Sequence, residues 1–154
     1  MRLARELTTR LVDAGGDVRT PTSEILVEGQ PTDKFLPGAH LEAAVHWTKF
    51  YLLFTTNDVP FEESLRISLL DEQFAPLDQA VIGGLYATGS FSALKLVDPD
   101  VVRFQFMGDA TWSVRLLSRR AFRMPFFSEP GGVYRPFGFS RQFVVSKQPI
   151  SEGG

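Results

Sequence analysis

FSALKLVDPDVVRFQFMGDATWSVRL (residues 91–116) is the stretch that decides the fold. Two turn signals, at residues 98–100 and 108–110, divide it into three runs of strand-forming residues. In the second and third runs, a large apolar side chain occupies every second position: Val102, Phe104, Phe106, Trp112, Val114 and Leu116. A period of two places alternate side chains on opposite faces of a strand. The stretch therefore predicts a three-stranded meander with one face turned toward a core.

Further strands are predicted on both sides of this meander. Leu65, Ile67 and Leu69 alternate with polar residues, which indicates another strand with one buried face. Residues 45–56 are rich in strand formers and predict a single strand that ends at Asn57, and residues 141–147 predict a last strand. Short strands joined by turns are typical of an antiparallel sandwich or barrel. We predict an all-β fold of about 7–9 strands.

The N-terminal segment shows a different spacing. Leu3, Leu7 and Leu11 recur every four residues, which predicts a short helix over residues 3–12 within a helical or flexible segment, residues 1–20. The chain of 154 residues has the length of one domain, so we expect residues 1–154 to form a single β-domain with a frayed tail over residues 149–154.

The composition excludes several classes of protein. The chain contains no cysteine, so disulfide scaffolds, thiol nucleophiles and cysteine-ligated metal sites are ruled out. Its N-terminus carries charges throughout and lacks the apolar core of a signal peptide. No stretch approaches the run of about 20 apolar residues that a membrane helix needs. We therefore expect a soluble, cytoplasmic protein.

The charge is distributed unevenly along the chain. Residues 1–100 contain 8 lysines and arginines against 15 acids, whereas residues 101–154 contain 8 against 3, so the net charges are −7 and +5. Either the basic part forms a face for an external anion, or the two parts pair with each other inside one domain. The second interpretation is favoured because both parts must pack together in a domain of this size.

Candidate catalytic and metal-binding groups are weak. His40, Glu42 and His46 would share one face of a strand, but six residues of strand separate the two imidazoles by about 20 Å. Paired acids occur only where turns or strand ends are predicted, at residues 62–63, 71–72 and 98–100. The glycine pair at residues 83–84 lacks the surroundings of a phosphate loop, and the Gly89-Ser90 element lacks those of a nucleophile elbow. No catalytic residue, metal or cofactor is predicted, and we lean against an enzyme.

The stretch from Arg119 to Phe143 interleaves arginines with aromatic rings around a proline- and glycine-containing loop. Strand alternation assigns three of its apolar side chains to the core: Phe122, Met124 and Phe143. The loop remains as a candidate partner-binding surface, and its proposed contacts are Phe126, Phe127, Tyr134 and Arg135.

Three functions are consistent with these patterns. The first is a non-catalytic β-domain that acts through a protein partner or by self-association. The second is a barrel that binds or converts a small molecule, in which an arginine such as Arg103 or Arg115 holds an anionic group. Its cavity would be lined by aromatic rings: Trp47, Tyr51, Phe104, Phe106 and Trp112. The third, a minor alternative, is binding of single-stranded nucleic acid, which the slightly acidic net charge of −2 disfavours.

Overall fold

The computed structural model describes residues 1–16, 19–57, 63–83, 90–106, 110–122, 130–136 and 140–149. This part of the chain is all-β, with thirteen strands in three antiparallel sheets and no helix, as predicted for the fold class. The strands are β1 (Arg2–Leu3), β2 (Leu7–Asp13), β3 (Thr22–Val27), β4 (Gln30–Pro37), β5 (His40–Trp47), β6 (Phe50–Thr56), β7 (Ser64–Leu70), β8 (Pro76–Gly83), β9 (Ser92–Val97), β10 (Val101–Gln105), β11 (Ala110–Phe122), β12 (Val133–Tyr134) and β13 (Ser140–Pro149).

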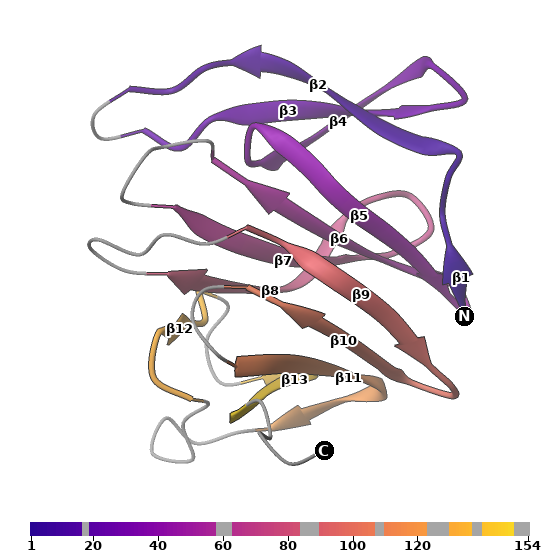
Figure 1. The fold of residues 1–154 in the computed structure, drawn as a ribbon. Helices are drawn as coiled ribbons and strands as arrows, with labels where there is room; N and C mark the ends of the chain where they lie inside the picture. Colours follow the sequence, from indigo (N-terminus) through magenta and orange to yellow (C-terminus); the bar gives the residue numbers. More distant parts are fainter. Residues whose placement is uncertain are drawn as a thin grey trace.

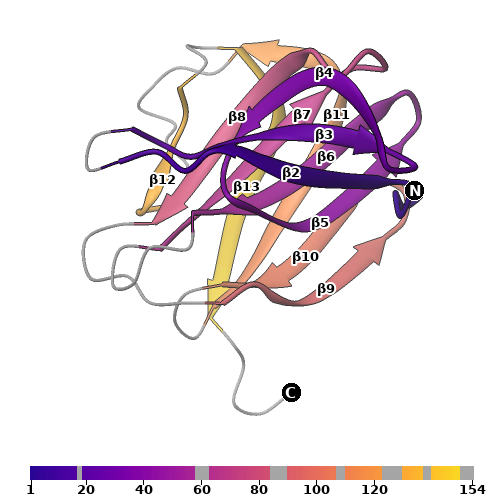
Figure 2. The same cartoon turned by 90° about the horizontal axis from the view of Figure 1, so that it is seen from above.

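The three sheets are stacked as layers (Figure 1). A six-stranded sheet, in the order β1-β5-β6-β7-β8-β12, lies in the middle. A four-stranded sheet, β13-β11-β10-β9, covers one of its faces, and a three-stranded sheet, β2-β3-β4, covers part of the other. Figure 2 shows, from above, the three-stranded sheet lying across the strands of the central one. The architecture is a sandwich with an additional outer layer.

Two hydrophobic cores separate these layers. The larger core lies between the six- and four-stranded sheets and contains eighteen of the described residues in buried positions, among them Phe54, Phe104 and Trp112. The smaller core lies beneath the three-stranded sheet and contains seven buried residues from the described part of the chain, among them Ile25 and Leu53. The three-stranded sheet is therefore attached to the rest of the molecule through a much smaller apolar contact than the four-stranded sheet.

Strand β6 contributes to both cores. Leu52 and Phe54 belong to the larger core, whereas Leu53, between them, belongs to the smaller one. Successive side chains of a strand point to opposite faces, so a strand covered on both sides must be apolar at consecutive positions. This requirement explains the unbroken run Phe50-Tyr-Leu-Leu-Phe54.

The predicted meander is confirmed as β9, β10 and β11. Strand β10 pairs with both neighbours in antiparallel register, with Phe104 opposite Trp112 and Val102 opposite Leu96. Val102, Phe104, Trp112 and Val114 face the larger core, each with 1% or less of its surface exposed. The alternation in residues 91–116 thus specified both the strands and their buried face.

The predicted N-terminal helix is wrong. Residues 2–3 form β1 and residues 7–13 form β2, which pairs with β3 along its length. A spacing of four is also a multiple of two, so Leu7 and Leu11 share one face of a strand as readily as one face of a helix. Leu7 is buried in the smaller core, while Leu11 remains half exposed.

The single strand predicted over residues 45–56 is two strands. Trp47 pairs with Phe50, and the turn between β5 and β6 consists of Thr48 and Lys49. Thr48 has a φ of 53°, in the left-handed region that threonine seldom occupies. The usual sequence signature of such a turn, asparagine or glycine, is missing, so the hairpin was not predicted. The number of strands is therefore higher than the predicted 7–9. The additional strands come from this hairpin, from the separate β2-β3-β4 sheet and from two strands of only two residues.

Of the three residues that the C-terminal stretch predicts for the core, only Phe143 has a side chain that the structure describes. Phe143 is fully buried in the larger core, as predicted. The side chain of Phe122 and all of Met124 lie outside the described part of the chain. The tail predicted over residues 149–154 also lies mostly outside it, since the described chain ends at Pro149, in β13.

Candidate interaction surfaces

A groove runs along one edge of strand β5. On its inner edge β5 pairs with β6 from His40 to Trp47. On its outer edge, the short strand β1 pairs only with Val45 and His46, and the amide of Ala4 donates to the carbonyl of Ala44 over 2.8 Å. After Ala4 the chain turns away to form β2. Between Leu41 and Ala43, β5 has no strand partner on this edge within the described residues.

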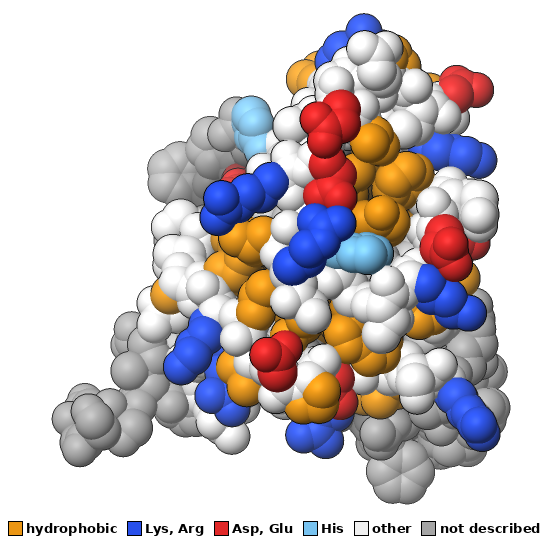
Figure 3. Space-filling view, turned by 90° about the vertical axis from the view of Figure 1, so that its right-hand side faces the viewer, with side chains coloured by type: hydrophobic (Ala, Val, Ile, Leu, Met, Phe, Trp, Pro, Cys, Tyr) orange, Lys and Arg blue, Asp and Glu red, His pale blue; other side chains and the backbone are white. Residues whose placement is uncertain are grey.

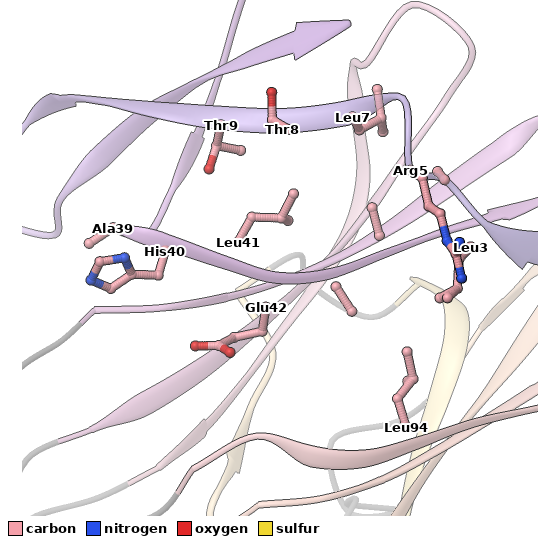
Figure 4. A pocket seen from close by; sticks show the side chains of 13 residues that line it. Leu3, Arg5, Leu7, Thr8, Thr9, Ala39, His40, Leu41, Glu42 and Leu94 are labelled. Atoms are coloured by element: carbon pink, nitrogen blue, oxygen red, sulfur yellow. The ribbon is translucent and has the colours of Figure 1, made fainter. Parts of the chain in front are cut away.

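The edges of all three sheets border this groove, which has a volume of about 500 Å³. In Figure 4, Leu41 points from β5 toward Thr8 and Thr9 of β2, and Leu94 points into the groove from β9 on the opposite side. Most of the lining is apolar: Leu3, Ala4, Leu7, Ala39, Leu41, Ala43, Ala44 and Leu94. Figure 3 shows apolar side chains gathered on the face of the molecule turned to the right in Figure 1, with charged side chains around them.

Three charged or titratable residues line the groove. Arg5 lies at the Leu3 end, and His40 lies at the other end with Glu42 between them (Figure 4). Glu42 is exposed and accepts a hydrogen bond of 2.9 Å from Oγ1 of Thr56. Arg5 is exposed and forms no ion pair with any residue that the structure describes. The groove therefore has an apolar middle, with a free cation at one end and an anion farther along.

A hydrogen-bonded corner holds the Arg5 end of the groove. Arg2 donates two hydrogen bonds to the carboxylate of Glu6, over 2.9 and 2.7 Å. These bonds, with a further contribution from the Glu6 backbone amide, lower the pKa of the Glu6 carboxyl to about 2. His46 stacks on Tyr51 beside this corner, with ring centroids 4.7 Å apart. The turn that carries Arg5 is thus tied to both β1 and β2.

Four of the five rings predicted to line a ligand cavity lie together in the larger core, and the fifth lies on the other face of the central sheet. Phe104, Phe106 and Trp112 are buried in the larger core, and Nε1 of Trp112 donates to the Phe106 carbonyl over 2.7 Å. Trp47 also packs there, and its Nε1 donates to the Pro99 carbonyl over 2.8 Å. Tyr51 lies on the other face of the central sheet, against Phe74.

The two arginines proposed to anchor an anionic ligand lie elsewhere. Arg103 alternates with the buried Val102 and Phe104, and Arg115 alternates with the buried Val114 and Leu116. Both side chains are exposed on the outer face of the four-stranded sheet. Phe104 and Trp112 therefore lie on the inner face of the four-stranded sheet, whereas the two arginines lie on its outer face.

Two of the residues predicted to bind a partner are described. Tyr134, in β12, has 66% of its surface exposed. The guanidinium of Arg135 is buried, forms an ion pair with Asp78 and donates to the carbonyl of Phe143 over 3.3 Å. Asp78 also accepts a hydrogen bond of 2.8 Å from the Gln142 amide. Phe126 and Phe127 lie outside the described residues.

The Asp78–Arg135 pair is one case of pairing between the acidic and basic parts of the chain. Asp78 is 1% exposed and comes from the acidic first part, whereas Arg135 comes from the basic last part. The guanidinium also lies over the Phe143 ring, 4.2 Å from its centroid. This contact fixes the segment after β12 against the ends of β8 and β13.

The remaining candidate chemistry is dispersed. Among the described residues, no three histidine or acidic side chains gather in a way that could hold a metal ion. Asp71 has a local role, because its Oδ1 accepts hydrogen bonds from the amides of Gln73 and Ala75. Glu62, Gly84 and Gly89 lie outside the described residues. No helix in the described part of the chain is long and apolar enough to cross a membrane.

The groove was not foreseen from the sequence. The leucine spacing predicts a helix at Leu3 and Leu7, and Leu41 and Leu94 come from strands about fifty residues apart. Only the fold brings these apolar side chains together.

The comparisons with known proteins add no identification: no protein-family model matches the chain, and neither curated proteins nor solved structures gave a significant match.

Proposed function

We propose that this protein is a non-catalytic binding domain that seats a short extended segment of a protein partner in the groove along β5. One observation carries the proposal: the edges of three sheets converge on an apolar groove, in which Leu41 and Ala43 lie on a strand edge that no other described strand covers. Extended peptides dock at exposed sheet edges, where main-chain contacts supply affinity and side-chain pockets supply specificity.

The shape of the groove favours an extended segment over a second copy of this chain. A two-fold dimer brings the same surface patch of both subunits together, so that patch must be complementary to itself. The edge of β5 is recessed between β2 and β9, and two recessed edges cannot reach each other. A single extended chain is narrow enough to enter, since neighbouring strands lie about 4.8 Å apart.

Side chains contribute more to recognition than a continued hydrogen-bond ladder. The pairing of β5 with β6 is shifted by a bulge between Leu41 and Ala43, and bulges interrupt regular strand addition. The segment would therefore place apolar side chains against Leu41 and Leu94. An acidic side chain would meet Arg5 at one end, and a basic one would meet Glu42.

Selection of peptides from a random display library tests the proposal. We expect selected peptides to carry an apolar centre flanked by one acidic and one basic residue. The double substitution Arg5→Glu, Glu42→Lys reverses both charges of the groove while keeping the net charge, and we expect it to weaken binding about tenfold or more. The matched control exchanges an exposed cation of β4 with an exposed anion of the β3–β4 turn, Lys34→Glu with Glu28→Lys, and should leave binding unchanged.

Two results would contradict this function. One is a failure to select any peptide that binds the folded protein. The other is a set of peptides whose affinity is unaffected by the groove variant or is reduced equally by the control. A peptide with the two charges exchanged should bind the groove variant better than the original protein, which separates lost recognition from lost folding.

A further inference from the structure

The four strands of one outer sheet carry positive charge without any negative charge. Strands β9, β10, β11 and β13 contain no aspartate or glutamate. They contain seven cations: Lys95, Arg103, Arg115, Arg119, Arg120, Arg141 and Lys147. Lys147 lies opposite the core residue Trp112, with its ammonium 5.2 Å from that ring, so it does not belong to the outer face. We propose that the outer face of this sheet binds an acidic polypeptide segment. The inference does not depend on the groove along β5.

Three of these cations form a row across neighbouring strands. Lys95 on β9 lies directly opposite Arg103 on β10. Arg115 on β11 lies opposite Val101, two residues from Arg103, and so is its diagonal neighbour. Directly opposite Cβ atoms in antiparallel strands are about 5 Å apart, and diagonal neighbours about 7–8 Å. All three side chains are exposed on the face turned away from the core.

The row is not neutralised within the part of the chain that the structure describes. Lys95, Arg103 and Arg115 form no ion pair there, and Asp98 and Asp100, in the turn at the end of β9, do not pair with them. Like charges directly opposite each other destabilise a sheet. Clustered charge of one sign also raises the local concentration of ligands of opposite sign. The repulsion within the row therefore lowers the stability of the sheet, and an external anion bound to the row would relieve it.

The chemistry of the face favours an acidic polypeptide over nucleic acid. Single-stranded nucleic acids stack their bases on exposed aromatic rings. The described rings of this sheet, Phe104, Trp112 and Phe143, all point into the core. Nucleic-acid modules are usually strongly basic overall, whereas this chain has an isoelectric point near 5.7. A long polyanion would extend beyond the cationic face, while a short acidic segment need not.

The direct test compares two probes of equal charge: a fluorescent glutamate-rich peptide and a fluorescent single-stranded oligonucleotide. Fluorescence anisotropy measures the affinity of each for the full chain as salt is raised. We expect the peptide to bind more tightly than the oligonucleotide and to be released by salt, because exposed charges are screened. Arg103→Glu and Arg115→Glu should each weaken peptide binding about three- to tenfold.

The matched control is Lys34→Glu, which makes the same change of charge at an exposed position of the three-stranded sheet. It should alter peptide affinity by less than about twofold. Equal losses for Lys34→Glu and Arg103→Glu, or no binding of the peptide at low salt, would overturn the proposal. Tighter binding of the oligonucleotide, weakened by Arg103→Glu, would overturn it in favour of nucleic acid. Because Arg5 and Glu42 are unchanged in these variants, the result is independent of the groove.

Discussion

The two outer sheets of this molecule treat charge in opposite ways. Strands β2, β3 and β4 contain two cations and three acids, and Arg10 pairs with the largely buried carboxylate of Glu24 over 2.6 Å. Strands β9, β10, β11 and β13 contain seven cations and no acid. Arg10 on one outer sheet is paired within the chain, whereas Lys95, Arg103 and Arg115 on the other form no ion pair with any residue that the structure describes. This difference supports the proposal that the outer face of the four-stranded sheet binds an acidic partner, because its clustered cations do not stabilise the fold.

The buried pair between Asp78 and Arg135 provides the reference for a cation that is satisfied inside the molecule. We expect Asp78→Ala to lower the free energy of unfolding by about 3–5 kcal/mol, because it leaves a guanidinium buried without its carboxylate. Chemical denaturation measures the loss. The exposed control Glu72→Ala should change stability by less than about 0.5 kcal/mol.

A rescue experiment checks that the loss comes from the uncompensated charge. The double substitution Asp78→Leu, Arg135→Met removes both charges and should recover much of the stability, since apolar residues of similar volume often replace a buried pair without cost. A double variant no more stable than Asp78→Ala would show that the pair itself is needed.

Reversing the charge of one arginine on each outer sheet should change the stability of the protein in opposite directions. Arg10→Glu places a second carboxylate opposite the buried Glu24 and should cost about 1–3 kcal/mol. Arg103→Glu removes the repulsion with Lys95 and should raise stability by about 0.2–1 kcal/mol. Thermal or chemical denaturation compares the two. Equal destabilisation by both substitutions would remove the contrast between the sheets.

The sizes of the two cores predict which outer sheet opens first. Ile25→Val in the smaller core should cost about 0.5–1.5 kcal/mol and speed amide exchange mainly in β2–β4. Ile67→Val, fully buried in the larger core, removes the same methylene and serves as the control. Its cost should be similar but spread over the central and four-stranded sheets. Uniform exchange changes in both variants would argue against separate attachment of the three-stranded sheet.

The smallest change in stability is expected when the pH is lowered. The pKa of Glu6 is lowered to about 2 in the folded protein, so its pairing with Arg2 contributes stability above the ordinary pKa near 4.5. That contribution is lost as the pH falls from about 4.5 toward 2. Because both side chains are solvent-accessible, the effect should stay below about 1 kcal/mol. Glu6→Gln should abolish this component of the pH dependence, and an unchanged profile would show that the pair contributes nothing.

Much of the fold could be predicted because strand alternation is local. The pattern at Val102, Phe104, Trp112 and Val114 identified both the strands and their buried face. The N-terminal segment could not be assigned in this way, since leucines that recur every four residues fit one face of a strand as well as one face of a helix. The turn at Thr48 was missed because it lacks the residues that usually permit a left-handed backbone.

The surfaces were harder to predict because they depend on register. The uneven charge along the chain was visible, but pairing between its two parts was expected to account for it. Asp78 and Arg135 do pair, whereas Lys95, Arg103 and Arg115 converge on one face only through the register of β9, β10 and β11. The groove likewise depends on the convergence of three sheets.

A titration followed by NMR tests the central claim most directly. The isotopically labelled protein is titrated with the glutamate-rich peptide, and amide shifts report where the peptide binds. We predict that the shifts concentrate on β9, β10 and β11 around Lys95, Arg103 and Arg115, and that β2–β4 stay unchanged. Shifts centred on the three-stranded sheet, or spread evenly over the surface, would contradict the assignment of the cation-only sheet as a binding face.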